Sequence, residues 1–239
     1  MLTIEEINKR IEKEFSENVF NQLLDKNLLE EYKKTKSTKE QINKITLLLK
    51  KYDMINEHFN DFINEYIEQN IKPGTKAVIR GNKFNTIIRK YLNEINKDLN
   101  LNIQFKKQSN KFNYDEIPDW IIEKDNKILI GMNQIDLWSG GEQVNRGLKY
   151  LQFSYDKEKY KNCDIKLICV VCNKLKLISN KNKKYTLFNI GFNNNTLCYI
   201  NNLKNLIYEF FDIKENNKEN IEENNDLINK LNNLSLKET

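Results

Sequence analysis

Apolar residues in the N-terminal third of the chain recur every three or four positions, as they do on one face of an α-helix. The pattern covers residues 3–33 and resumes over 38–69, after a polar break at 34–39. Thr3 and Glu6 have the spacing of a helix-capping box at the start of the first segment. We therefore predict two long helices that pack on each other or serve as a dimer interface.

The hydrophobic pattern changes after Pro73-Gly74, a pair that is typical of turns. Residues 82–98 again have helical spacing, and short strand-like runs follow. The run at 164–172 is mostly apolar, which is typical of a strand buried on both faces. Beyond the helix at 82–98 we predict strands at 101–107, 119–123, 128–135, 164–172, 185–190 and 196–200, and helices at 140–158 and 201–212.

The order of these elements indicates an α/β (α+β) fold. From 82 to 172 the order is helix, three strands, helix and strand, with a hairpin in the middle. We expect a helical region at 1–72 that is suited to dimerisation, followed by a core at 73–213. The Asn-, Glu- and Lys-rich tail at 214–239 is expected to be disordered or a marginal helix.

Composition narrows the class of protein. The 239 residues carry a formal net charge of +5, with a mean hydropathy of −0.73. No apolar run approaches the roughly 20 residues of a membrane helix, and the N-terminus lacks a secretory pattern. The four cysteines do not make a disulfide framework in a chain of this size. We expect an intracellular, cytoplasmic protein with no membrane partner, and its charge permits a polyanionic partner without requiring one.

The rare residue types are unevenly distributed. Asn, Lys and Ile are abundant, which indicates an AT-rich coding sequence, so residues with GC-rich codons stand out. Both prolines, both tryptophans and the only alanine lie between 73 and 138, and most glycines and arginines lie between 74 and 147. This bias directs attention to two windows, 73–89 and 116–149.

Asp119 is the first candidate for chemistry, because it follows Pro118 at the start of a predicted strand. The hairpin turn is centred near 125–126, so the cross-strand neighbour of Asp119 is near Met132, beside Asn133 and Gln134. A carboxylate that faces two amides suits a divalent cation such as Mg²⁺, which takes oxygen ligands. The alternative is an ordinary strand end with a solvated carboxylate.

Two glycine-containing segments are candidates for binding phosphate. Gly140-Gly141 precedes a predicted helix whose first turn carries Gln143, Asn145 and Arg146, which can reach phosphates or base edges. A tight packing turn is the alternative. The second segment surrounds Gly81 at the expected entry to the helix at 82–98 and carries Arg80, Asn82 and Lys83. Here the alternative is a loop in which Asn82 caps the helix.

The proline-aspartate pair and the hairpin, within this order of elements, resemble the PD-(D/E)XK nuclease superfamily. The stretches 134–147 and 73–85 are similar to segments of a group of its type II restriction endonucleases. The resemblance covers about 73–172. It implies a restriction endonuclease-like core in which Asp119 binds Mg²⁺.

The third strand departs from that family, which carries Glu-x-Lys or Asp-x-Lys there. Neither pair occurs at 131–134. Because side chains alternate on a strand, either Gly131 and Asn133 or Met132 and Gln134 occupy those places. The resemblance favours Gln134 in the place of the lysine, keeps Asn133 as a catalytic candidate, and leaves Glu116, Asp136 or Glu142 to supply the second acid.

The resemblance implies a sequence-specific, Mg²⁺-dependent endonuclease that cleaves double-stranded DNA as a homodimer, paired with a cognate DNA methyltransferase. Its DNA contacts would be Arg80, Asn82, Lys83, Gln143, Asn145, Arg146 and Lys149. Two alternatives remain: a non-catalytic DNA-binding protein on the same fold, which the missing Glu-x-Lys favours, and a structural protein that acts through its long helices.

Overall fold

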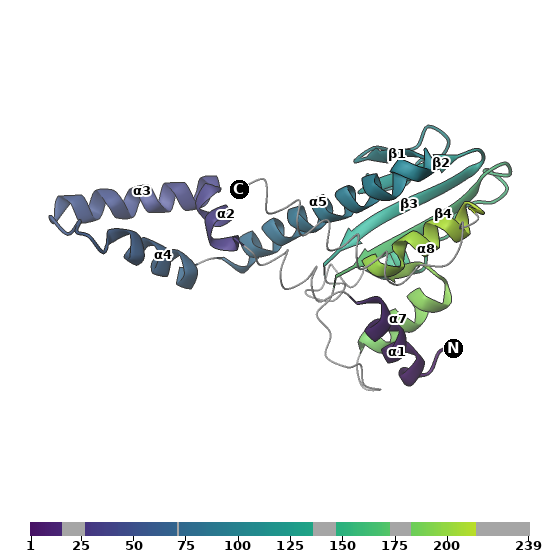
Figure 1. Ribbon diagram of the computed structural model, residues 1–239, viewed down its shortest axis with the longest axis horizontal. Helices are drawn as coiled ribbons and strands as arrows, with labels where there is room; N and C mark the ends of the chain where they lie inside the picture. Colours follow the sequence, from purple (N-terminus) through teal and green to yellow (C-terminus); the bar gives the residue numbers. More distant parts are fainter. Residues whose placement is uncertain (16–26, 71, 136–146, 173–182, 214–239) are drawn as a thin grey trace. The chain divides into compact units, whose positions relative to one another are not determined.

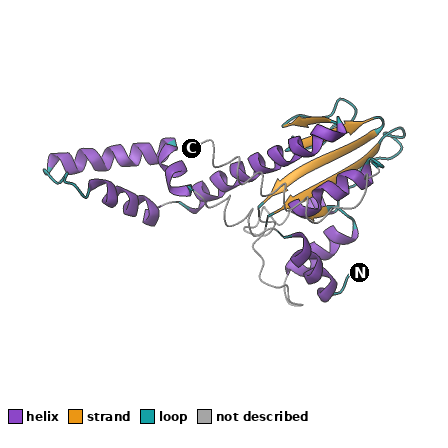
Figure 2. Cartoon of the chain, viewed as in Figure 1, coloured by secondary structure: helices purple, strands orange, loops and turns teal. Residues whose placement is uncertain are grey.

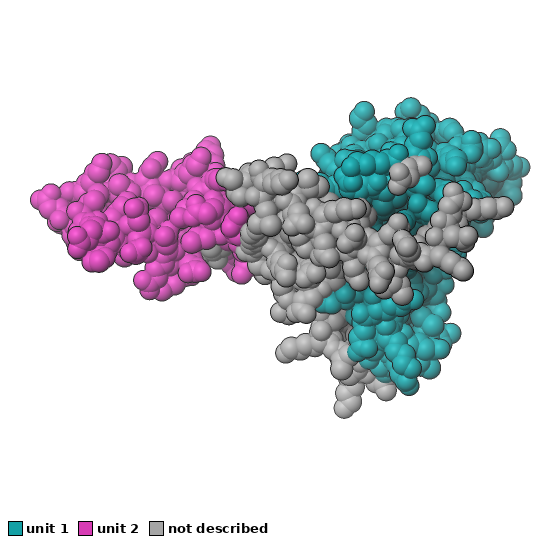
Figure 3. Space-filling view, in the orientation of Figure 1, with its two compact units in different colours: residues 1–20, 84–239 teal, residues 21–83 magenta. Residues whose placement is uncertain are grey.

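The computed structural model describes residues 1–15, 27–70, 72–135, 147–172 and 183–213. The chain divides into two compact units, residues 21–83 and residues 1–20 with 84–239 (Figure 3). It is a mixed α/β protein in which N-terminal helices precede a five-stranded mixed sheet with interspersed helices (Figure 1). None of the described helices has the length and apolar composition that crossing a membrane requires.

The strands, drawn in orange in Figure 2, form a single sheet with the order β1-β2-β3-β4-β5. The pairs β1–β2 and β2–β3 are antiparallel, whereas β3–β4 and β4–β5 are parallel. The strands at 101–107, 119–123, 128–135, 164–172 and 196–200 were therefore predicted correctly within a few residues. Their bounds are Asn102–Phe105, Trp120–Lys124, Lys127–Gln134, Asp164–Val171 and Leu197–Tyr199.

Each face of the sheet is covered by helices. One face carries Ile130 and Met132 and packs against α1 (Ile4–Glu14), α7 (Lys183–Asn193) and the helical residues 147–151. On the opposite face lie α8 (Ile200–Phe210) and residues 84–99 of α5 (Pro73–Leu99) (Figure 1). The side chains of β4 are buried on both faces, as its sequence predicted.

The unit formed by residues 21–83 has its own small apolar cluster. It contains α2 (Leu28–Lys34), α3 (Lys36–Lys51), α4 (Phe59–Asn70) and the first part of α5. The buried members of the cluster are Tyr32, Ile63, Ile67 and Ile79.

The single helix predicted at 38–69 is wrong, because the chain is not helical at 52–58. Asp53 has a φ of 52°, in the left-handed region. The N–H of Met54 donates to the carbonyl of Leu49 at 2.9 Å, and that of Asp53 to the carbonyl of Lys50 at 3.2 Å. This is a Schellman ending, with Asp in the place that glycine usually takes. Because no glycine stands at this position, the sequence pattern did not predict that α3 ends here.

Three further predictions, of a turn, a strand and a helix, need correction. Pro73 and Gly74 are not a turn but the first residues of α5, where proline is tolerated because its missing N–H has no helical partner there. Residues 185–190 lie in α7 rather than in a strand. The helix predicted at 140–158 ends by 152, and its first part lies outside the described residues.

The first helix does not join the helices that follow it in sequence. The prediction of one helix at 3–33 is not met, since α1 ends at Glu14 and α2 begins at Leu28. The capping box of Thr3 and Glu6 is present as predicted. Helix α1 contacts α7, α8 and β5, and so belongs to the sheet-containing unit.

Glu14 fixes α1 to the end of β5. Its carboxylate accepts hydrogen bonds from Arg10 Nε at 2.6 Å, from Asn202 Nδ2 at 3.1 Å and from the N–H of Tyr199 at 3.3 Å. Burial raises the pKa of Glu14 above its ordinary value of 4.5, and the Arg10 guanidinium acts in the opposite direction.

The raised pKa of Glu14 predicts a specific pH dependence. Between 4.5 and its folded-state pKa, the folded protein binds more protons at Glu14 than the unfolded chain does, so this group lowers the free energy of unfolding as pH rises. The Glu14→Gln variant lacks this effect. In urea unfolding, the stability of the native protein relative to Glu14→Gln should therefore fall with rising pH and then level off. A difference that stays constant with pH would contradict the assignment.

Candidate functional site

Asp119 lies directly before β2, at the end of the hairpin that is farther from the turn. Its N–H donates to the carbonyl of Gly131 at 3.0 Å, and its carbonyl accepts the N–H of Lys106 at 3.2 Å. Since Trp120 pairs with Gly131, the cross-strand neighbour of Asp119 is Met132, as predicted. The side chain is only 10% exposed, so its charge is held largely out of water.

Both oxygens of the Asp119 carboxylate have partners. Oδ2 accepts the N–H of Asn133 at 2.7 Å, and Oδ1 pairs with Nζ of Lys106. Hydrogen bonds to an ionised group are about twice as strong as neutral ones, so these two contacts fix the orientation of the carboxylate.

Lys106, which forms the ion pair with Asp119, also has an unusual backbone conformation. It follows β1 and has a φ of 53°. This conformation costs an L-residue about 1–2 kcal/mol. Among the described residues, every other non-glycine residue at positive φ is Asn or Asp, the types that tolerate it best. Strain of this kind concentrates at functional sites. The sequence did not single out Lys106, because nothing in it marks a left-handed lysine.

The strand register decides which residues of β3 share the face of Asp119. The pairing of β2 with β3 places Met132 and Gln134 on that face, and Gly131 and Asn133 on the other. Met132 is 4% exposed and belongs to the core. Gln134 is half-buried at the carboxyl end of β3, so it is the polar side chain of this strand on the Asp119 face.

The Asn133 side chain is engaged elsewhere. Its Oδ1 accepts the indole N–H of Trp120 at 3.0 Å, and its Nδ2 donates to Oδ1 of Asn85 on α5 at 2.9 Å. These bonds join β2, β3 and α5. Asn133 therefore contributes its backbone N–H to Asp119, while its amide holds the sheet to the helix.

Glu116 is anchored on the Asp119 face by the helical residues 147–151. Its Oε2 accepts the hydroxyl of the buried Tyr150 at 2.7 Å, and its Oε1 lies 3.4 Å from Nζ of Lys149. The same Nζ lies 3.3 Å from Oδ2 of Asp115. Lys149, a predicted DNA contact, thus forms ion pairs with two carboxylates of the protein itself.

Two buried groups connect Glu116 with Asp119. Tyr114 is 7% exposed, and among the described residues its hydroxyl has no hydrogen-bond partner. Burial raises the pKa of Tyr114, and the charge of Glu116 raises it further. Burial also raises the pKa of Cys169, with a second contribution from Asp119. Tyr114 and Cys169 both belong to the buried apolar cluster on this face of the sheet.

The predicted phosphate cradle around Gly81 is not formed. Arg80, Asn82 and Lys83 lie within α5, where the backbone N–H groups are used by the helix itself. Lys83 pairs with Glu31 at 3.1 Å. These residues belong to the unit of residues 21–83, whereas Asp119 belongs to the other unit.

The remaining candidates lie outside the described residues. They are Asp136, Glu142, Gln143, Asn145 and Arg146. In the described part of the chain, no three His, Cys, Asp or Glu side chains come together as a metal site. The site that is described thus comprises Asp119, Lys106, Glu116 and Gln134.

Comparisons with protein-family models, with curated proteins and with solved structures find no match to this chain.

Proposed function

We propose that this protein is a Mg²⁺-dependent, sequence-specific endonuclease of the type II restriction class that cleaves double-stranded DNA. The observation that carries the proposal is the Asp119 carboxylate, fixed by the N–H of Asn133 and paired with the Lys106 ammonium. A carboxylate beside an ammonium is the pair that the PD-(D/E)XK resemblance requires. Here the lysine comes from the end of β1 instead of from β3.

The strain at Lys106 supports a role beyond stability. Water screens this ion pair at its half-exposed lysine end, so the pair contributes on the order of 1 kcal/mol, no more than the left-handed conformation costs. A lysine that is 54% exposed can reach a phosphate or a water as well as Asp119. In the proposed reaction Lys106 stabilises the charge that develops on the phosphate, and Gln134 orients the attacking water.

The acids of this site suit a hard divalent cation. Mg²⁺ usually takes one or two carboxylates together with waters and phosphate oxygens. Asp119 would hold it, and Glu116, Asp136 and Glu142 are the candidates for a second acid. When bound, Mg²⁺ would supply Lewis-acid stabilisation and lower the pKa of a water ligand.

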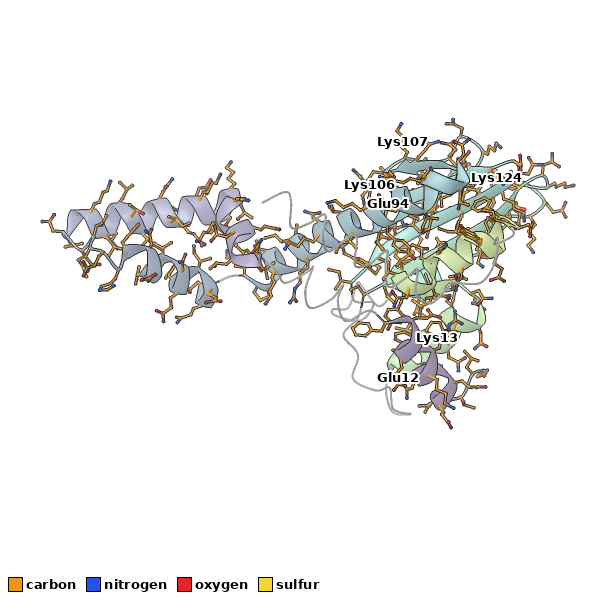
Figure 4. The ribbon with its side chains drawn as sticks, viewed as in Figure 1. Glu12, Lys13, Glu94, Lys106, Lys107 and Lys124 are labelled. Carbon is orange, nitrogen blue, oxygen red and sulfur yellow. The ribbon has the colours of Figure 1, made fainter. Side chains whose placement is uncertain are left out.

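Lysines near the same strands would bind the DNA backbone. Lys106, Lys107 and Lys124 lie around β1 and β2 (Figure 4). Each phosphate contact releases counterions, so binding should weaken steeply as salt rises. A two-fold dimer would match a palindromic site, and a cognate methyltransferase would protect host DNA.

The Asp119→Asn variant should lose cleavage of plasmid and phage DNA in Mg²⁺, because it removes the charge that the cation and Lys106 both require. Discrete bands produced by the native protein, and absent with this variant, are the expected result. Asp125→Asn is the matched control, since Asp125 is exposed at the hairpin turn and asparagine tolerates its positive φ. Loss of activity in both variants would count against a specific role for Asp119.

A non-catalytic DNA-binding protein is the second candidate. The lack of a Glu-x-Lys or Asp-x-Lys pair on β3 favours this function. It predicts salt-sensitive DNA binding without cleavage, equal in the native protein and Asp119→Asn. Absence of both binding and cleavage would refute both functions.

A further inference from the structure

One large apolar side chain is exposed beside the candidate site. Ile117 is 62% exposed and lies two residues before Asp119. Among the described residues of the sheet-containing unit, Met1 is the only other large apolar residue that is exposed. A single exposed apolar residue is ordinary on a protein surface, so exposure alone assigns no role to Ile117. The case for a role depends on its backbone and on its position.

The backbone that carries Ile117 is held on both sides. Before it, the amide of Gln108 accepts the N–H of Tyr114 at 3.2 Å and donates to the carbonyls of Tyr114 at 2.6 Å and Glu116 at 2.9 Å. After it, Pro118 is buried, and a proline restricts the residue before it to extended conformations. Ile117 is therefore presented to solvent by a fixed backbone.

The position of Ile117 brings it close to any phosphate that is bound at Asp119. Two residues of extended chain span about 7 Å at most, so the Cα atoms of Ile117 and Asp119 lie no farther apart than this. Successive base pairs of B-DNA are about 3.4 Å apart along the helix axis. Ile117 thus lies within about two base-pair steps of the phosphate that Asp119 would face.

The chemistry of an isoleucine side chain limits what it can recognise in DNA. It offers neither a charge nor a hydrogen bond to a phosphate. It can contact the methyl group of thymine in the major groove, or the face of a base that it separates from its neighbour. Both are apolar surfaces of the bases.

We propose that Ile117 is a specificity-determining residue that contacts an apolar surface of a base pair next to the cleaved bond. This proposal rests on the proposed function, since it takes Asp119 to face a phosphate of double-stranded DNA. A contact of this kind adds a sequence preference at one position of the site, whereas lysine contacts to phosphates add none. The apolar surface is either a thymine methyl or a base face that is exposed by local unstacking.

The Ile117→Ala variant should cleave plasmid DNA in Mg²⁺ with a kcat/KM that is lower by about tenfold. Its melting temperature should be unchanged, because the deleted atoms are exposed in the free protein and are buried only against DNA. Ile117→Val keeps a branched apolar side chain and should retain most of the rate. Ile55→Ala is the matched control and should cleave like the native protein, since Ile55 is 40% exposed in the non-helical connection 52–58 of the other unit.

Two modified DNAs distinguish the two apolar surfaces. DNA amplified with dUTP in place of dTTP lacks every thymine methyl. If Ile117 contacts a methyl group, the native protein should cleave this DNA more slowly than ordinary DNA, and Ile117→Ala should cleave the two at equal rates. A duplex with 2-aminopurine beside the mapped cleavage site becomes more fluorescent when that base is unstacked. If Ile117 separates two bases, the fluorescence should rise with the Asp119→Asn protein and stay low with Ile117→Ala/Asp119→Asn.

The outcomes separate this inference from the proposed function. Cleavage by Ile117→Ala at the native rate would overturn the inference and leave the nuclease activity standing. A slower rate without either the methyl effect or the fluorescence effect would also overturn it, because the loss would then not come from a base. If the native protein binds DNA without cleaving it, equal Kd values of the native protein and Ile117→Ala have the same meaning. A native protein that neither binds nor cleaves DNA would refute the proposed function and this inference together.

Discussion

The Lys106→Gly variant should lose about 10²- to 10³-fold in the rate of DNA cleavage while its stability is unchanged or slightly higher. Removing the ammonium takes away the cation beside Asp119, which in the proposed reaction stabilises the charge that develops on the phosphate. At the same time glycine relieves the left-handed backbone at this position, where φ is 53°. The two effects have opposite signs, so a general loss of folding cannot imitate the expected result.

Single-turnover cleavage at saturating Mg²⁺, together with thermal melting, gives the two measurements for Lys106. Lys107→Gly is the comparison, since Lys107 is the neighbouring exposed lysine and has no ion pair with Asp119; as a proposed DNA-backbone contact it should weaken DNA binding but leave the single-turnover rate unchanged once the protein is saturating. Lys106→Arg keeps the charge and should retain part of the rate. Cleavage by Lys106→Gly at the native rate would assign the lysine to Asp119 orientation only and would remove the main support for the catalytic proposal.

Gly131→Ala should be the most destabilising conservative change in the sheet, costing about 3 kcal/mol or more. A Cβ at this position would lie 1.8 Å from Cε2 and 2.1 Å from Cδ2 of Trp120, whose indole is fully buried. The ring cannot move away without weakening its bond to Asn133, whose amide also donates to Asn85. For a protein of this size the melting temperature should fall by roughly 10 °C.

Gly81→Ala is the matched control for Gly131→Ala. Gly81 lies inside α5, and a Cβ there would meet nothing within 4 Å. The same substitution should therefore raise stability by about 0.5–1 kcal/mol, because alanine favours a helix. Trp120→Leu removes the indole that an alanine at position 131 would meet. The cost of Gly131→Ala should therefore be smaller in the Trp120→Leu background than in the native protein. Equal effects of the two alanine substitutions would show that the indole does not set the cost.

Much of the sheet was predictable because its strands follow simple patterns. Alternation or continuous apolar character identified the strands, and the position of the hairpin turn placed Asp119 opposite Met132. The same alternation left two registers open for β3. Only the pairing of Trp120 with Gly131 decides between them and sends Asn133 toward α5.

The elements that were mispredicted depend on tertiary contacts. Residues 185–190 include aromatic and β-branched types that favour strands, yet they form part of α7. Leu187, Phe188 and Phe192 of that helix are buried in the main core. Packing against the sheet therefore outweighs local preference. The phosphate site predicted around Gly81 failed for a related reason, since the helix continues through a glycine.

Only part of the candidate site could be predicted from the sequence. Asp119, Glu116 and Gln134 stand beside a recognisable strand pattern, whereas Lys106 reaches Asp119 from another strand with no motif of its own. Tyr150 was missed for the same reason, because its bond to Glu116 joins residues that are 34 positions apart.

The residues of this protein with a left-handed backbone conformation show how helix ends can be predicted in other chains of similar composition. Asp53 and Asp212 end α3 and α8 at φ values of 52°, and Asn195 has a φ of 51° just before β5. When an AT-rich coding sequence makes glycine scarce, Asn and Asp occupy the left-handed positions at the ends of helices and strands. In such sequences an isolated Asn or Asp after a lysine-rich helical run deserves the weight that a glycine would receive elsewhere.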